Sequence, residues 1–230
     1  MYVREQFLNH LMLHKDKDYI KVLTGVRRCG KSTLLEQYKD LLTSQGVNSN
    51  NIIFIKLDDL ANMELLNYKS LYDFIKNHTN KNEQFYIFLD EIQLVDQFER
   101  TLASLQLYKN LDVYISGSNA YLLSNELATL LSGRYVEINI FPFSFAEYLD
   151  YHKGDIRERF NNYIKRGGFP NSLKIDNDTE YNDYITGVLN TILVKDVLNR
   201  VGIGNALLLE SISMFLLRTS RKLSSQFPCT

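Results

Sequence analysis

The chain has 230 residues, of which 45% are hydrophobic and 23% are charged, and its formal net charge is -1. This composition is typical of a globular protein and not of a disordered one, and the near-zero charge argues against broad electrostatic binding of nucleic acid. The two cysteines, Cys29 and Cys229, lie far apart and indicate neither a disulfide framework nor a zinc site. No apolar run approaches the length of a membrane span and the charged N-terminal segment is unlike a signal peptide, so we expect a cytoplasmic protein.

Strand-like and helix-like segments alternate along the first 140 residues. Helical spacing of apolar residues predicts helices at 2–14, 32–44, 69–78, 97–109 and 119–131. Short apolar or β-branched runs predict strands at 19–24, 52–57, 85–89, 113–116 and 136–140. Strands separated by helices imply right-handed crossovers, so we expect an α/β fold whose parallel sheet is covered on both faces.

After Pro142 the strand pattern stops. The remaining segments with a helical period are 143–151, 156–165, 179–199 and 204–218. We therefore expect a domain boundary near residue 142, with a helical domain following the sheet domain.

The strongest chemical signal is the sequence GVRRCGKST, which satisfies G-x-x-x-x-G-K-[ST] between a predicted strand and a predicted helix. Its glycines let the backbone curl so that N–H groups and the helix N-terminus converge on phosphates. The lysine adds a positive charge for the β- and γ-phosphates, and the first hydroxyl can ligate Mg²⁺. We expect the nucleotide contacts to come from Gly25, Val26, Arg27, Arg28, Cys29, Gly30, Lys31, Ser32 and Thr33.

Some side chains of this loop have two interpretations. Arg27 and Arg28 either contact phosphates or a neighbouring subunit, or point into solvent, and the sequence does not decide. Cys29 lies in a loop whose positive field would lower its pKa and favour redox chemistry. The alternative, which we favour, is that Cys29 is a small neutral filler.

The second signal is the apolar run FYIFL, which is followed by Asp90 and Glu91. Ligands of open α/β sheets bind at the carboxyl ends of the strands, where these carboxylates are expected to lie. Asp90 would hold Mg²⁺ together with Ser32, and Glu91 has the position of a general base for water. The alternative is an ordinary acidic loop. A carboxylate in the position of Glu91 favours an ATPase over a small-molecule kinase. The sequence contains no N-K-x-D element of the kind that selects guanine.

Two weaker signals concern the γ-phosphate. In VYISGSN, Asn119 is the first candidate for a sensor that orients water, with Ser118 the second, although either residue would also cap a helix. In LSGR, Arg134 is a candidate arginine finger acting in cis or in trans. The alternative for Arg134 is a surface arginine at a helix C-terminus, where the helix dipole favours cations.

The strings GVRRCGKST, FLDEIQ, ISGSNAYLLS, LSGRYVEINIFPFSFAEYL and GGFP occur in this order. In this respect the chain resembles the prokaryotic and archaeal-type AAA-family ATPases, P-loop ATP-binding proteins related to the signal-transducing NTPase lineage. The resemblance covers residues from about 20 to about 200, and the string from Arg134 to Leu149 makes it specific.

The resemblance implies a five-stranded sheet in the order 5-1-4-3-2, an ATPase core at 1–142 and a helical lid at 143–201. It also implies that a Gly-x-Pro element of the lid, Gly168-Phe169-Pro170, approaches the nucleotide; otherwise GGFP is a turn between helices. Family members continue into a winged helix and a further domain. Residues 202–230 would begin that winged helix without completing it, so we expect a truncated or frameshifted product.

These inferences favour a protein that binds ATP and Mg²⁺, hydrolyses ATP and acts as a switch or remodeller. The alternative is a DNA-binding regulator whose nucleotide site gates a winged helix. The partners left open are a second copy of the chain, an unidentified protein, and DNA at the C-terminal segment, where basic residues outnumber acidic ones. No membrane partner is expected.

Overall fold

The computed structural model describes residues 2–118, 131, 133–192 and 211. The chain divides into two compact units, Met1–Asp176 and Asn177–Thr230, and each is described by itself. Residues 143–176 thus belong to the same compact unit as the sheet. The functional division at 142 and at 201 stays a prediction, and most of 202–230 lies outside the described residues.

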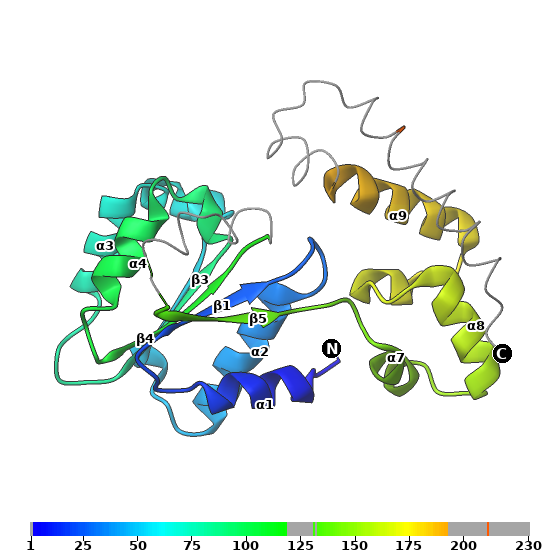
Figure 1. Cartoon of the computed structure of the whole chain (residues 1–230), viewed down its shortest axis with the longest axis horizontal. Helices are drawn as coiled ribbons and strands as arrows, with labels where there is room; N and C mark the ends of the chain where they lie inside the picture. The colour runs from blue at the N-terminus through cyan, green and yellow to red at the C-terminus, as the bar shows by residue number, and fades with distance from the viewer. Residues whose placement is uncertain (1, 119–130, 132, 193–210, 212–230) are drawn as a thin grey trace. The chain divides into compact units, whose positions relative to one another are not determined.

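The first unit is built on one parallel sheet of five strands in the order β2-β3-β4-β1-β5 (Figure 1). The strands are β1 (Ile20–Thr24), β2 (Ile52–Lys56), β3 (Phe85–Asp90), β4 (Leu111–Ser116) and β5 (Tyr135–Asn139). All four strand pairs are parallel. This arrangement confirms the order 5-1-4-3-2 and the α/β fold.

Helices cover both faces of the sheet and give three layers (Figure 1). On one face, α3 (Tyr68–Asn77) and α4 (Phe98–Leu105) bury Leu71 and Leu102 against the apolar side chains of β3. On the other face, α1 (Glu5–Leu13) and α2 (Lys31–Ser44) pack in a second cluster. Every residue of β1 and β3 is buried, as expected for strands covered on both faces.

The segment after β5 forms α7 (Phe145–Tyr151), α8 (Ile156–Arg166) and a 3₁₀ helix at Pro170–Lys174. Ser144 and Glu147 form a capping box that begins α7. Phe143, Tyr148 and Leu173 form a small core of their own. In the second unit, α9 spans Asp178–Thr191.

Three expected helices differ from the structure or lie mostly outside its described residues. The helix predicted at 97–109 is shorter, because α4 ends at Leu105. The chain turns there because the side chain of Asn110 donates to the carbonyls of Asn80 and Glu83, at 2.7 and 2.9 Å, and Tyr108 pairs with Tyr72 on α3. The helices expected at 119–131 and 204–218 lie almost entirely outside the described residues.

Short 3₁₀ helices at Ser49–Asn51, Leu60–Leu65 and Ile92–Leu94 were not predicted. Within the described ranges, no helix is long and apolar enough to cross a membrane.

Candidate functional site

The loop between β1 and α2 has a backbone that requires glycine at two positions. Gly25 has a φ of 148°, and a Cβ atom there would lie 2.2 Å from the carbonyl oxygen of Ile140. Gly30, which precedes the first residue of α2, has a φ of 104°. The two glycines therefore allow the tight curl that brings the loop N–H groups to the start of the helix.

The side chain of Lys31 is buried within this loop and donates to its backbone. Its side chain is only 4% exposed. The ammonium donates hydrogen bonds to the carbonyl oxygens of Gly25, at 2.9 Å, and Val26, at 3.2 Å. Because both acceptors are neutral, the positive charge of Lys31 is kept within the loop and is available to an anion.

The remaining loop side chains differ in exposure. Val26 and Arg28 are exposed, whereas Cys29 is fully buried in the cluster formed by α1 and α2. Burial raises the pKa of the Cys29 thiol and outweighs the lowering effect of Lys31 and Arg4. The alternative of a lowered thiol pKa is therefore wrong, and the geometry fits the favoured interpretation of Cys29 as a neutral filler.

Asp90 ends β3 beside the phosphate loop and is 2% exposed. Burial raises its pKa, while hydrogen bonds from Ser116 and Ser32 act in the opposite direction. The hydroxyl of Ser116, the last residue of β4, donates directly to the Asp90 carboxylate. The structure thus brings together Ser32 and Asp90, the two expected metal ligands, and adds Ser116. A polar residue ending an apolar strand was the signal that could have identified it.

Glu91 follows Asp90 in the left-handed region, with a φ of 57°. Its backbone N–H donates to the Ser116 hydroxyl at 3.2 Å. Its carboxylate accepts a hydrogen bond from the side-chain amide of Gln93. Gln93 and Ser116 thus fix the side chain and backbone of Glu91, respectively. Gln93, within the motif FLDEIQ, was not among the expected site residues.

Of the two candidate sensors, only Ser118 can be placed, because Asn119 lies outside the described residues. Ser118 follows β4 and is 1% exposed. Its hydroxyl has no hydrogen-bond partner in the described part of the chain. A buried hydroxyl without a partner is costly, so its environment suits a bound group that completes its hydrogen bonding.

Arg134 lies away from these residues. It immediately precedes β5, and its carbonyl accepts a hydrogen bond at 3.0 Å from the N–H of Ile20, the first residue of β1. Arg134 is therefore at the amino ends of the strands, whereas Lys31, Asp90 and Ser116 are at or beyond the carboxyl ends. Its side chain is exposed.

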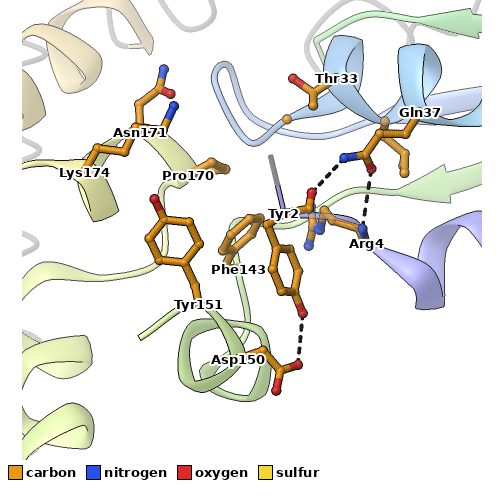
Figure 2. Close-up of a pocket in the computed structure, with 12 residues that line it drawn as sticks. Tyr2, Arg4, Thr33, Gln37, Phe143, Asp150, Tyr151, Pro170, Asn171 and Lys174 are labelled. Atoms are coloured by element: carbon orange, nitrogen blue, oxygen red, sulfur yellow. Dashed lines mark hydrogen bonds between the residues drawn. The ribbon is translucent and has the colours of Figure 1, made fainter. Parts of the chain in front are cut away.

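A cavity of about 550 Å³ opens beside the phosphate loop (Figure 2). Its walls come from α2, from the N-terminal segment and from the region after β5. They include Tyr2, Thr33, Gln37, Phe143, Tyr151 and Pro170. Pro170 is adjacent to the loop, since its Cγ lies 3.8 Å from where a Cβ of Gly30 would be. The N-terminal wall was not anticipated, because no motif marks it.

Gly168, two residues before Pro170, is also constrained. A Cβ on Gly168 would lie 2.1 Å from the carbonyl oxygen of Phe143, and the N–H of Phe143 donates to the carbonyl of Gly168 at 2.7 Å. This close backbone approach fixes the segment that carries Pro170 against the start of α7.

The residues at the carboxyl edge fit a nucleotide with Mg²⁺. The loop offers a buried ammonium and backbone curvature, and Ser32 and Asp90 offer neutral and anionic oxygen ligands. Within the described ranges, no group of three or more histidine, cysteine or acidic residues forms a metal cage. None is needed, because Mg²⁺ is typically held by one or two carboxylates, waters and substrate phosphates.

Comparisons with known proteins show the family and the fold of the chain. A family model described as an AAA domain matches residues 17–149. A protein of Haemophilus influenzae is 38% identical over 222 residues, covering 94% of this chain and 55% of its own length. A protein of Methanocaldococcus jannaschii is 33% identical over 203 residues, covering 81% of this chain and 43% of its own length. Both are described as uncharacterized. The chain thus spans about half the length of these curated relatives.

Among solved structures, AMPPCP-bound DnaA from Aquifex aeolicus matches with a TM-score of 0.50 and 17% identity. The match covers 86% of this chain and 63% of the DnaA chain. At this identity the similarity concerns the fold alone.

Proposed function

This chain belongs to the AAA domain family, and we propose that it binds ATP with Mg²⁺, hydrolyses the γ-phosphate bond and acts as a switch or remodeller. The observation that carries the proposal is the juxtaposition of the Lys31 loop with Asp90 and Ser32 at one edge of the sheet. Phosphoryl transfer needs mainly positioning and charge stabilisation, which these groups supply.

The phosphate loop binds the triphosphate in this proposal. Lys31 moves part of its hydrogen bonding from the carbonyls of Gly25 and Val26 to phosphate oxygens, with little change of position. The N–H groups at the start of α2 point toward the same anion. Ser32 and Asp90 hold Mg²⁺, which neutralises charge on the phosphates when bound.

Glu91 acts as the general base. Its carboxylate is partly exposed and is oriented by Gln93, and it lies one residue after the metal-binding Asp90. Accepting a proton from the attacking water is the role that this position supports. Ser118 or Asn119 contacts the γ-phosphate.

The cavity beside Thr33 and Pro170 receives the nucleoside. Its volume of about 550 Å³ falls in the range of small-molecule pockets, and aromatic and polar groups both line it. Phe143 and Tyr151 supply apolar surface, and Pro170 connects this cavity to the phosphate loop.

Arg134 acts in trans in this proposal. Its exposed side chain is at the opposite edge of the sheet from Lys31, so it cannot serve its own site without rearranging the strands. An arginine supplied by a neighbouring copy would stabilise transition-state charge there. The proposal therefore includes a homo-oligomer.

The test compares phosphate release and binding of a fluorescent ATP analogue by the wild type, Lys31→Ala and Glu91→Gln. We expect Lys31→Ala to lose binding, because the buried ammonium is removed. Glu91→Gln should keep binding but lose turnover by about 100-fold or more, as expected for a missing general base. Lys39→Gln removes a half-exposed charge farther along α2 and should behave as the wild type. Equal phosphate release by all four proteins would refute hydrolysis at this site.

A further inference from the structure

Arg4 is a buried arginine that is not part of any recognised motif. It precedes α1, and its side chain is only 5% exposed. Its Nε and Nη2 atoms donate to the two carboxylate oxygens of Glu147 on α7, at 2.7 and 3.0 Å. The guanidinium also lies over the rings of Phe7 and Phe143, at 4.3 and 5.1 Å from their centroids. Such a bidentate, desolvated pair has a strongly defined geometry.

The third nitrogen of the same guanidinium reaches two backbone carbonyls. Nη1 donates to the carbonyl of Phe141 at 2.9 Å, and through a longer bond of 3.4 Å to the carbonyl of Cys29. Phe141 lies in the connection between β5 and α7, and Cys29 lies in the phosphate loop. One side chain thus contacts the loop, the connection and α7.

The contact with Cys29 bears on the phosphate-binding groups. In a trans peptide the C=O and the following N–H point in opposite directions. A donor that holds the carbonyl of Cys29 on the protein side therefore directs the N–H of Gly30 to the other side, where the loop cradles an anion. Arg4, which also lines the cavity beside the loop, thus acts on this amide through the carbonyl of Cys29.

The neighbouring backbone strengthens this link. Gln37 on α2 donates to the carbonyl of Tyr2 at 2.7 Å, and its Oε1 accepts from the N–H of Arg4 at 3.4 Å (Figure 2). Tyr2 donates to Asp150 on α7 at 3.1 Å. The N-terminal segment Tyr2–Arg4 therefore joins α2, which begins at the loop, to α7.

We propose that Arg4 is a positioning residue, and that its bidentate pair with Glu147 couples the phosphate loop to the segment 143–176 so that nucleotide affinity depends on the pair. The inference rests on the proposed function, because it concerns nucleotide binding at the same loop. Glu147 is suited to the role: although burial raises its pKa, hydrogen bonds from Arg4 and Ser144 outweigh this, and the pKa lies below its usual value. The carboxylate of Glu147 is therefore ionised at neutral pH.

The test is a double-mutant cycle in nucleotide affinity, using Arg4→Lys, Glu147→Gln and the double variant. Lysine keeps the charge but cannot make the bidentate contact or reach both carbonyls. We expect each single variant to raise the Kd of a fluorescent ATP analogue, and the KM for ATP, by about tenfold, within the usual range of coupling between sites. The double variant should show about the same tenfold loss and not the product of the two, because both changes break one contact. The value of kcat should change much less.

Arg100→Lys is the matched control, since Arg100 lies on α4 at the opposite face of the sheet and should leave the Kd unchanged. Thermal unfolding without nucleotide distinguishes a purely structural role of the pair from a role in nucleotide affinity. If Arg4→Lys and Glu147→Gln lower the melting temperature but leave the Kd and KM as in the wild type, the inference is refuted while the proposed function stands. If the wild type itself binds no ATP analogue, both are refuted. Should Arg4→Lys fail to fold, Glu147→Gln, which keeps the shape of the side chain, decides the question alone.

Discussion

Asp90 and Glu91 are adjacent acidic residues with different environments. Asp90 is 2% exposed and accepts hydrogen bonds from two serines, whereas Glu91 is partly exposed and is oriented by Gln93. Two neighbouring carboxylates can take different roles when their environments differ. The buried Asp90 suits a fixed metal ligand, and the more accessible Glu91 suits proton transfer. Ser116 serves both, since it donates to the carboxylate of Asp90 and accepts from the N–H of Glu91.

Ser116→Ala tests this shared role. The substitution removes the donor that orients the Asp90 carboxylate and leaves the N–H of Glu91 without its partner. We expect the Mg²⁺ concentration for half-maximal ATP hydrolysis to rise by about tenfold, the lower range for loss of a group that orients a metal ligand. Ser104→Ala removes a hydroxyl that donates to the carbonyl of Arg100 on α4 and should keep the wild-type Mg²⁺ dependence. Coincident Mg²⁺ titrations for the two variants would contradict the role of Ser116.

At the scale of single residues, the sequence predicted groups that belong to a motif and missed those that support it. Gly25, Gly30, Lys31 and Asp90 lie at the positions that the phosphate-loop and strand patterns imply. Arg4 was missed because its partners at Cys29, Phe141 and Glu147 are brought near only by the folded chain. For Cys29, the less favoured alternative of a lowered pKa is wrong, because it considered the field of the loop without the burial that α1 and α2 impose.

Among the elements, β1 and β4 are joined by a buried ion pair away from the nucleotide edge. Lys21 on β1 and Asp112 on β4 lie 2.5 Å apart and are 0% and 1% exposed. Asp112 also accepts hydrogen bonds from the N–H of Asp16, at 2.8 Å, and the hydroxyl of Tyr114, at 3.0 Å. Lys21 donates to the carbonyl of Lys17 at 2.7 Å. This network satisfies both charges at the point where the chain enters the central strands.

Asp112→Asn should therefore be costly. It leaves the ammonium of Lys21 buried without its counter-charge, so we expect the free energy of unfolding to fall by about 3–5 kcal/mol. Urea denaturation followed by circular dichroism measures the change. Asp40→Asn is the matched control, because Asp40 pairs with Lys39 on the surface of α2 and should cost no more than about 1 kcal/mol. Similar losses in the two variants would show that the Lys21–Asp112 pair is not a central stabilising contact.

The elements themselves were largely predictable, because buried parallel strands are continuous apolar runs and the helices have a clear period. All five strands occur close to the predicted positions. The strand order came from the family resemblance, since the pattern of elements does not determine which strands are neighbours. The early end of α4 was not predictable, because it depends on contacts of Tyr108 and Asn110 with residues about 30 positions away.

At the scale of the whole molecule, the carboxyl ends and the amino ends of the strands carry complementary chemical groups. The carboxyl edge carries Lys31, Asp90 and Glu91, and the amino edge presents the exposed side chain of Arg134. Within a single copy, Arg134 cannot reach Lys31 and Glu91 without breaking the pairing of β1 with β5. Two copies can do so if the amino edge of one faces the phosphate loop of the other. Under the proposed function, hydrolysis then requires an oligomer, whereas nucleotide binding does not.

Mixing two inactive variants tests this arrangement. Arg134→Ala keeps its own loop but offers no arginine to a neighbour, and we expect it to bind ATP normally while kcat falls by about 1,000-fold, the lower range for an arginine finger. Lys31→Ala lacks a working loop but still presents Arg134. A mixed oligomer joins the intact loop of one variant to the intact arginine of the other, so phosphate release should rise several-fold above either variant alone. Mixing Arg134→Ala with a double variant, Lys31→Ala with Arg134→Ala, is the control and should recover nothing. No recovery in the first mixture, with subunit exchange verified by fluorescence transfer between labelled copies, would contradict a finger acting in trans.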